Sequence, residues 1–204
     1  MKVRTLICLA CVCLMSTAAV ALAQPKEKAA KPAAMDPKAM QDAMAKAAAL
    51  GPQHESLKKL VGEWNCSVKS WMDPSGPPQE TKSTSVVTAM MDGRYVQENV
   101  TGEMMGMPFS GMSVTGYDNI QKKYVSTWID NFGTGIMMSE GTPDASGNVV
   151  KWTGESSDPM TGKKTKYRMV SRTVSDNQRT YEMYSTGPGG KEAKMMEITY
   201  DRKM

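Results

Sequence analysis

The sequence predicts an all-β protein, a ten-stranded antiparallel up-and-down barrel preceded by one or two short N-terminal helices. From Gly62 to the C-terminus, apolar residues recur at every second position, which is typical of strands. Nine clusters of turn-forming residues interrupt this alternation and imply ten strands. The connections are too short for a crossover helix, so sequential strands should pair antiparallel. Closing the sheet into a barrel removes its exposed edges.

The first 23 residues are typical of a secretory signal peptide. Lys2 and Arg4 precede an apolar run, and Ala21-Leu22-Ala23 supplies small residues at the recognition positions. We expect cleavage between Ala23 and Gln24, giving an exported protein, periplasmic or secreted, with no membrane span remaining. Loss of the two cations lowers the formal net charge from +4 to +2, which does not favour a nucleic-acid partner.

Three further segments are predicted after the signal peptide. Residues 24–35 are mostly Ala, Lys and Pro without an apolar period, which indicates a flexible linker. Residues 36–61 form a helical segment, in which Asp36 caps the first helix and Pro37 occupies its first turn. The spacing of apolar residues predicts a second helix from about Gln53 to Val61. Residues 62–204 form the barrel domain.

The nine turn clusters divide the barrel domain into its strands. They lie at residues 73–78, 92–93, 103–108, 118–121, 131–133, 143–148, 158–163, 175–179 and 187–190. Asp92-Gly93 predicts a two-residue hairpin, because a type I′ turn needs positive φ at both positions.

The first strand has a clear inward face. Gly62, Trp64, Cys66 and Val68 share one face, and polar residues occupy the other. We therefore expect Trp64 to plug one end of the barrel, with Gly62 allowing the preceding helix to approach. Cys66, the one cysteine left after signal removal, should be a small, buried and unreactive side chain.

The Gly62-x-Trp64 pair resembles the signature of the calycin superfamily, which includes lipocalins and fatty-acid-binding proteins. In those barrels the tryptophan packs against an Arg or Lys of the last strand, and the resemblance assigns that place to Arg202. Longer stretches resemble the bacterial family called domain of unknown function 1579, and they cover nearly all of residues 51–203. These stretches are "GPQHESLKKLVGEW", "MMGMPFSGMSVTGYDN", "KKYVSTWIDNFGTGIM", "SSDPMTGKK" and "EMYSTGPGGKEAKMMEITY". The resemblance implies a calycin-like barrel and carries no established activity.

Barrels with more than about eight strands enclose more space than their own side chains easily fill, and many hold one small ligand. We therefore predict non-covalent binding of a small apolar or amphipathic molecule, with no cofactor. The candidate ligand-binding residues are Trp64, Glu98, Met112, Tyr124, Trp128 and Asp130.

Two other functions remain open. An enzyme could work inside the barrel with a buried carboxylate, either Glu98 or Asp130. A soft-metal protein could bind Cu(I) through thioethers clustered around one loop. Those thioethers belong to Met104, Met105, Met107 and Met112. The 20 methionines are spread through the sequence, however, as an adaptable apolar lining would be. His54 is the only histidine, which gives too few ligands to argue for a zinc site. A hydrolase triad is not predicted, because the string closest to a nucleophile elbow, "GMSVTG", places Ser113 on a strand.

Overall fold

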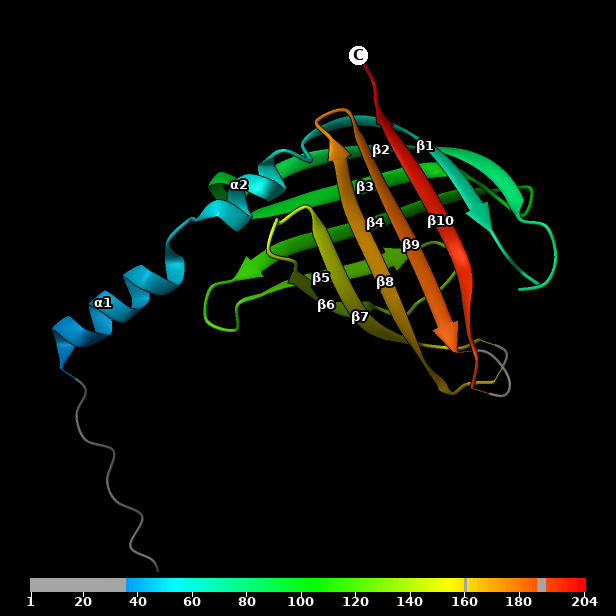
Figure 1. The fold of residues 1–204 in the computed structure, drawn as a ribbon. Coiled ribbons are helices and arrows are strands. Elements are labelled where there is room, and N and C mark those ends of the chain that lie inside the picture. Colours follow the sequence, from blue (N-terminus) through cyan, green and yellow to red (C-terminus); the bar gives the residue numbers. More distant parts are fainter. Residues whose placement is uncertain (1–35, 160, 187–189) are drawn as a thin grey trace, which may run out of the picture. The chain divides into compact units, whose positions relative to one another are not determined.

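In the computed structural model, which describes residues 36–159, 161–186 and 190–204, ten antiparallel strands close into a barrel (Figure 1). The strands are β1 (Gly62–Ser70), β2 (Gln79–Met90), β3 (Tyr95–Met104), β4 (Met107–Asp118), β5 (Lys123–Asp130), β6 (Met137–Pro143), β7 (Val149–Ser157), β8 (Lys164–Ser175), β9 (Gln178–Thr186) and β10 (Glu192–Arg202). Each strand pairs with its neighbours in the chain, and β1 also pairs with β10. The predicted up-and-down barrel is confirmed. The predicted signal peptide and linker lie outside the described residues.

Helix α1 (Pro37–Ala48) begins where the sequence predicts, with Asp36 as its cap. The helix buries none of its side chains. Its C-terminal end is held by polar contacts instead. The Asn119 side-chain amide donates to the carbonyls of Ala47 at 2.9 Å and Ala49 at 2.7 Å. In the part of the chain that the structure describes, no helix is long and apolar enough to cross a membrane.

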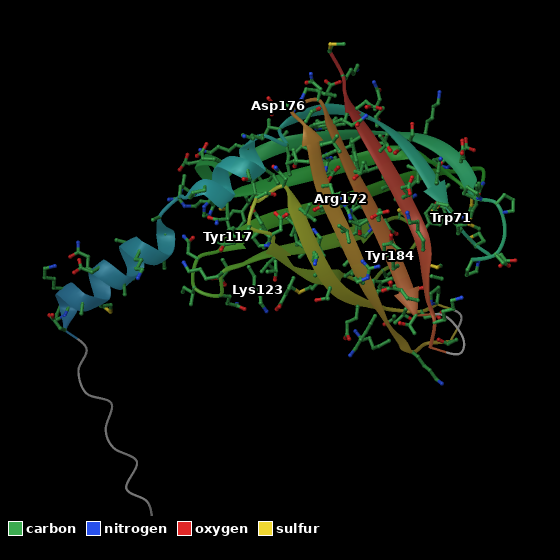
Figure 2. The ribbon with its side chains drawn as sticks, in the orientation of Figure 1. Trp71, Tyr117, Lys123, Arg172, Asp176 and Tyr184 are labelled. Carbon is green, nitrogen blue, oxygen red and sulfur yellow. The ribbon has the colours of Figure 1, made fainter. Side chains whose placement is uncertain are left out.

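Helix α2 (Pro52–Lys58) covers one end of the barrel. It buries His54 and Leu57 and packs against β3 and β4. The His54 ring meets the edge of Tyr117, which Figure 2 labels beside this helix, at 6.0 Å between centroids. The helix ends at Lys58 and does not reach Val61 as predicted. The next residues tighten into a turn, in which the Val61 N–H donates to a carbonyl three residues back.

The connection between β2 and β3 is longer than the predicted two-residue turn. A 3₁₀ turn, η1 (Met91–Gly93), together with Arg94, separates the two strands. Asp92 and Gly93 have positive φ as the turn type required, but Met91 does too. Gly93 is buried, because the aliphatic part of Lys58 from α2 lies where its Cβ would be. The β2–β3 connection therefore leaves room for the Lys58 side chain of α2.

Trp64 closes the end of the barrel that α2 covers. Its side chain is 2 % exposed, and its indole N–H donates to the Leu60 carbonyl at 2.9 Å. Arg202 pairs with Trp64 in register, and its guanidinium carbon lies 4.2 Å from the centroid of the tryptophan ring. The same guanidinium donates at 2.7–2.9 Å to backbone carbonyls of Lys59, Val61 and Asp176. One arginine thus joins the last strand, the first strand and the turn after α2.

Gly62 makes room for this arginine. Its φ is +138°, a region that L side chains rarely adopt, and an added Cβ would lie 2.5 Å from Nη1 of Arg202. The sequence suggested that Gly62 admits the preceding helix, whereas the structure places the Arg202 side chain there. Gly62, Trp64 and Arg202 therefore form one closing unit.

The barrel is packed at the α2 end and more open toward the other. Buried apolar side chains gather around Trp64, and they include Leu57, Cys66, Val87, Val96, Tyr124 and Tyr200. Toward the opposite end, where Figure 2 labels Trp71, inward-facing side chains are only half-buried. These include Val100, Trp128, Met183, Met196 and Ile198. We call this second region the open half of the barrel.

The closing unit predicts a strong coupling between Trp64 and Arg202. Trp64→Ala removes a large buried side chain and should lower the free energy of unfolding by about 3–5 kcal/mol. Arg202→Ala should cost less, and the two losses should not add, because both remove the same contact. Denaturant unfolding of the two single variants and the double variant should give a coupling of about 0.5–3 kcal/mol.

Lys203→Ala is the matched control, since Lys203 follows Arg202 but makes an exposed ion pair with Glu63. Its loss should add to that of Trp64→Ala. Additive losses for Trp64 and Arg202 themselves would contradict the closing unit.

Candidate functional site

An ion pair lies inside the barrel, between the packed end and the open half. Glu98 of β3 and Arg179 of β9 approach to 2.6 Å across the interior, and their side chains are only 17 % and 14 % exposed. Ser85 of β2 donates its hydroxyl to the same carboxylate oxygen, Oε1, at 2.5 Å. In the strand register, Glu98 stands between buried Val87 and buried Ser113. Oε1 of Glu98 therefore accepts two hydrogen bonds, one from Arg179 and one from Ser85.

Arg179 also connects the ion pair to the closed end. Its guanidinium carbon lies 3.7 Å from the Tyr200 ring centroid and 5.1 Å from that of Trp64. Such cation–π contacts are stronger in a partly desolvated setting than on a surface. Trp64 therefore contacts two arginines, Arg202 at the end of the barrel and Arg179 in its interior.

Two phenols accompany the pair. Burial raises the pKa of Tyr181 and Tyr200, and the negative charge of Glu98 raises both further. Both side chains therefore keep their protons at neutral pH and stay available as hydrogen-bond donors. Neither hydroxyl has a hydrogen bond to another residue in the described ranges, although Tyr200 is only 7 % exposed.

Cys66 pairs in register with Tyr200 and is expected to be unreactive. It is 3 % exposed, and burial, with a smaller effect from Glu98, raises the pKa of its thiol to about 11. Its Sγ contacts the Trp64 carbonyl at 3.9 Å. A buried thiol that stays protonated at neutral pH is a poor nucleophile, because the thiolate is the reactive form.

Trp128 and Asp130 lie toward the open end of β5. The Trp128 indole N–H donates to Oδ2 of Asp130 at 2.8 Å, and Oδ1 accepts the Phe132 N–H at 2.9 Å. Phe109 of β4 stacks on Trp128, with 6.4 Å between ring centroids and 20° between planes. The register partner of Asp130 is Gly111, and a Cβ there would collide with the Trp128 ring. Trp128 and Asp130, both candidates from the sequence, therefore contact each other, and Phe109 packs beside them.

Tyr124 and Met112 lie apart from the ion pair. Tyr124 belongs to the packed end, where it is 4 % exposed and its hydroxyl donates to the Gln53 carbonyl at 3.4 Å. Met112 lies on the face of β4 opposite to buried Ser113 and pairs in register with Ile129. Their places do not favour a part in an interior site centred on Glu98.

The methionines proposed for copper are spread along the β3–β4 hairpin. Met104 and Met107 pair in register across the turn, Met105 is in the turn with φ of 56°, and Met112 lies further along β4. The arrangement brings only two of them opposite each other. Among the described residues, no three His, Cys, Asp or Glu side chains are placed to hold a metal ion.

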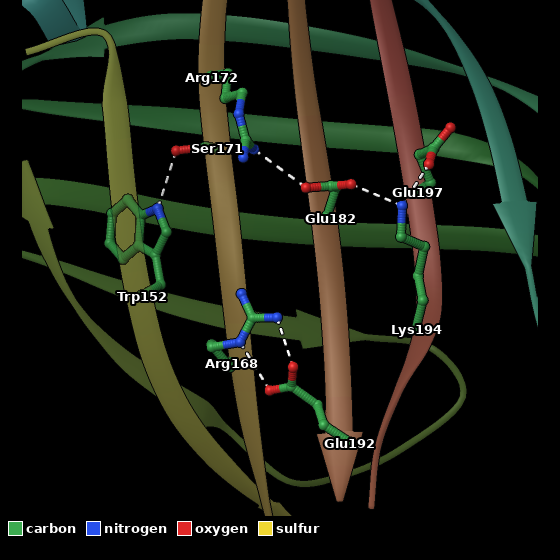
Figure 3. A network of polar contacts seen from close by, with 8 residues as sticks. All are labelled: Trp152, Arg168, Ser171, Arg172, Glu182, Glu192, Lys194 and Glu197. Atoms are coloured by element: carbon green, nitrogen blue, oxygen red, sulfur yellow. Dashed lines mark hydrogen bonds and ion pairs between the residues drawn. The ribbon is translucent and has the colours of Figure 1, made fainter. Parts of the chain in front are cut away.

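Two grooves lie over strands β5 to β10, of about 410 and 680 Å³. Outward-facing charged residues line much of them, and ion pairs between neighbouring strands continue across this face (Figure 3). Arg168 binds Glu192 through two hydrogen bonds of 2.7 Å and lies 4.0 Å from the Tyr184 ring centroid. Lys194 contacts Glu182 at 2.6 Å and Glu197 at 2.7 Å, and Glu182 also pairs with Arg172. The charges drawn in Figure 3 contact one another, whereas the interior holds two phenol hydroxyls without a hydrogen-bond partner in the described ranges, so the interior is the stronger candidate.

The sequence offered Glu98 and Asp130 as alternative inward acids but missed Arg179, Tyr181 and Tyr200. The alternation along β9 puts Arg179 on the same face as Tyr181 and Met183, and this pattern was the available signal. Arg179 and Glu98 are 81 positions apart in the sequence, and alternation within one strand does not reveal a contact between them.

The ion pair predicts a large asymmetry between single and double variants. Arg179→Met leaves the Glu98 carboxylate in the interior without its cation and should cost about 3–5 kcal/mol. Adding Glu98→Gln should restore part of this loss, because the uncompensated charge is removed. Urea unfolding of both proteins measures the difference.

Arg172→Met is the control, since Arg172 pairs with Glu182 at 3.1 Å but is 45 % exposed. That change should cost about 0–1 kcal/mol. An equally small cost for Arg179→Met would contradict a structural role for the interior pair.

Comparison with known proteins identifies the family and the fold. The crystal structure of Rv2717c from M. tuberculosis is similar with a TM-score of 0.57 at 15% identity, covering 76% of this chain and 100% of that one. The S-type phycobiliprotein lyase CPES from Guillardia theta is similar with a TM-score of 0.51 at 11% identity, covering 74% and 92%. Comparison with curated protein sequences gave no significant match. Residues 49–202 match the family described as "Protein of unknown function (DUF1579)", and the chain belongs to that family.

Proposed function

We propose that the barrel binds one small amphipathic or apolar molecule in its open half. The observation that carries this proposal is the half-buried state of side chains that face inward. Val100, Met183 and Met196 point into the barrel, yet none of them is covered to the degree of Trp64 or Val87. Apolar side chains that face inward without full burial offer a surface that a ligand covers favourably.

Small side chains on the inward faces support the same proposal. Several strands place serine or glycine where a filled barrel would place larger apolar residues. These positions include Ser85, Ser113, Ser126, Ser139, Gly154 and Ser171. The hydroxyl groups of the serines would also suit a molecule that is partly polar.

Catalysis by an interior carboxylate is the weaker candidate. One of the structural relatives is named a lyase, but a likeness at 11% identity concerns the fold. Glu98 is engaged by Arg179 and Ser85, and Asp130 by Trp128. Donors of the protein itself hold both carboxylates, which favours a structural role, and of their four oxygens only Oε2 of Glu98 has no partner among the described residues.

Binding should be measurable with an environment-sensitive apolar dye and by quenching of tryptophan fluorescence. Val100→Trp places a larger side chain in the open half and should weaken dye binding about tenfold or more, a loss of about 1.4 kcal/mol. The matched control is Val86→Trp, because Val86 is on neighbouring β2 but faces outward with 40 % exposure. The control should bind the dye as the unchanged protein does. Equal weakening in both variants, or no dye binding at all, would argue against an interior site.

We also propose that the protein is exported and acts outside the cytoplasm. The basic start, the apolar run and Ala21-Leu22-Ala23 support this, as they are typical of a signal peptide. Intact-mass measurement of the protein from the exported fraction should give a chain beginning at Gln24. A species that retains residues 1–23 would contradict both the cleavage and the compartment.

A further inference from the structure

Several hydrogen-bonding atoms around the interior ion pair have no partner. Oε1 of Glu98 takes the hydrogen bonds from Arg179 and Ser85, and Oε2 has no partner among the described residues. The hydroxyls of Tyr181 and Tyr200 are also free within the described ranges. Arg179 Nε is the one fully buried side-chain nitrogen or oxygen without a partner in those ranges, so Oε2 and both hydroxyls keep some accessible surface.

These free atoms belong to one group. Arg179 and Tyr200 are register partners on β9 and β10, and Tyr181 follows two residues along the same face. The charge of Glu98 acts on both phenols, since it contributes to the raised pKa of each. Val100 follows Glu98 by two residues on the inward face of β3, and Tyr181 pairs in register with Ile198, so the group adjoins the open half and forms its floor.

The charges in this group decide which ligand chemistry fits. Glu98 and Arg179 compensate each other, so an anionic group near the floor would meet the carboxylate and a cationic group would meet the guanidinium. The phenols offer O–H donors, and Oε2 offers an acceptor. A neutral ligand group with an acceptor beside a donor can accept from the phenols and donate to Oε2 without bringing a charge into the interior.

We infer, on the basis of the proposed function, that the bound molecule carries a neutral carboxamide-type head group at this floor. Its carbonyl oxygen accepts from Tyr200 and Tyr181, and its N–H donates to Oε2 of Glu98. Its apolar part lies in the open half along Val100 and Met183. The amphipathic ligand class is thereby narrowed to neutral amides, including lactams, as distinct from fatty acids and alkylamines.

Three probes with one alkyl chain test this inference: decanamide, decanoate and decylamine. Each competes at neutral pH with the apolar dye for the unchanged protein. Decanamide should bind about tenfold more tightly than either charged probe, because only the amide supplies an acceptor and a donor without charge. Equal affinities for the three probes would overturn the inference while leaving interior binding in place. If the dye and all probes fail to bind, the proposed function itself fails.

Tyr200→Phe removes only a hydroxyl that has no partner in the described protein, so the fold should be unaffected. Decanamide should bind this variant about tenfold more weakly, with unchanged dye affinity. Tyr95→Phe is the control, as Tyr95 lies on the outer face of β3 with 40 % exposure. Decanamide affinity that is unaltered by Tyr200→Phe would overturn the inference.

Glu98→Gln should invert the preference among the probes. The variant frees Arg179 from its carboxylate, so decanoate should bind more tightly than decanamide. Glu155→Gln, on an exposed position of β7, should leave the original order. A folded Glu98→Gln variant that still prefers decanamide over decanoate would count against the assignment of Glu98.

Discussion

The contact between Trp64 and two arginines is the interaction on which the rest of this barrel depends. Arg202 lies on the indole and bonds to the backbone at the end of α2, so the last strand is tied to the start of the first. Arg179 lies on the inner side, in contact with Tyr200 and paired with Glu98. The same indole therefore closes the barrel and supports the polar floor of its interior. Loss of the Trp64 side chain would therefore disturb both the closure of the barrel and the polar floor of its interior.

This arrangement divides the barrel into two halves that differ in how far their inward side chains are buried. Near α2 the inward side chains are large and buried, and they supply the apolar burial that stabilises the fold without any disulfide among the described residues. Beyond Glu98 the inward positions carry serine, glycine and half-buried apolar residues. On the proposed function a ligand would complete the packing of this second region, while the half near α2 supplies most of the apolar burial.

Alternation and turn chemistry were sufficient for the strand number, the closure and the partner strands, since these depend on local pattern and on avoiding open edges. They were insufficient for the middle strands. On β4 the apolar residues Met112 and Val114 face outward, while Gly111 and Ser113 face inward, because the Trp128 ring fills the space over Gly111. Hydrophobicity alone assigns the faces of such a strand wrongly. The Arg179 contact was hidden for another reason, as it crosses the interior and follows from the closed shape of the sheet.

The central claim is that a small molecule binds inside the open half and not in the charged outer grooves. Titration of the isotopically labelled protein with decanamide, followed by nuclear magnetic resonance, tests this most directly. We expect shifts at the methyl groups of Val100 and Met183 and at the indole N–H of Trp128, with Val86 unchanged. Shifts confined to the outer groove, at Lys123, Thr153 and Tyr184, would contradict the account.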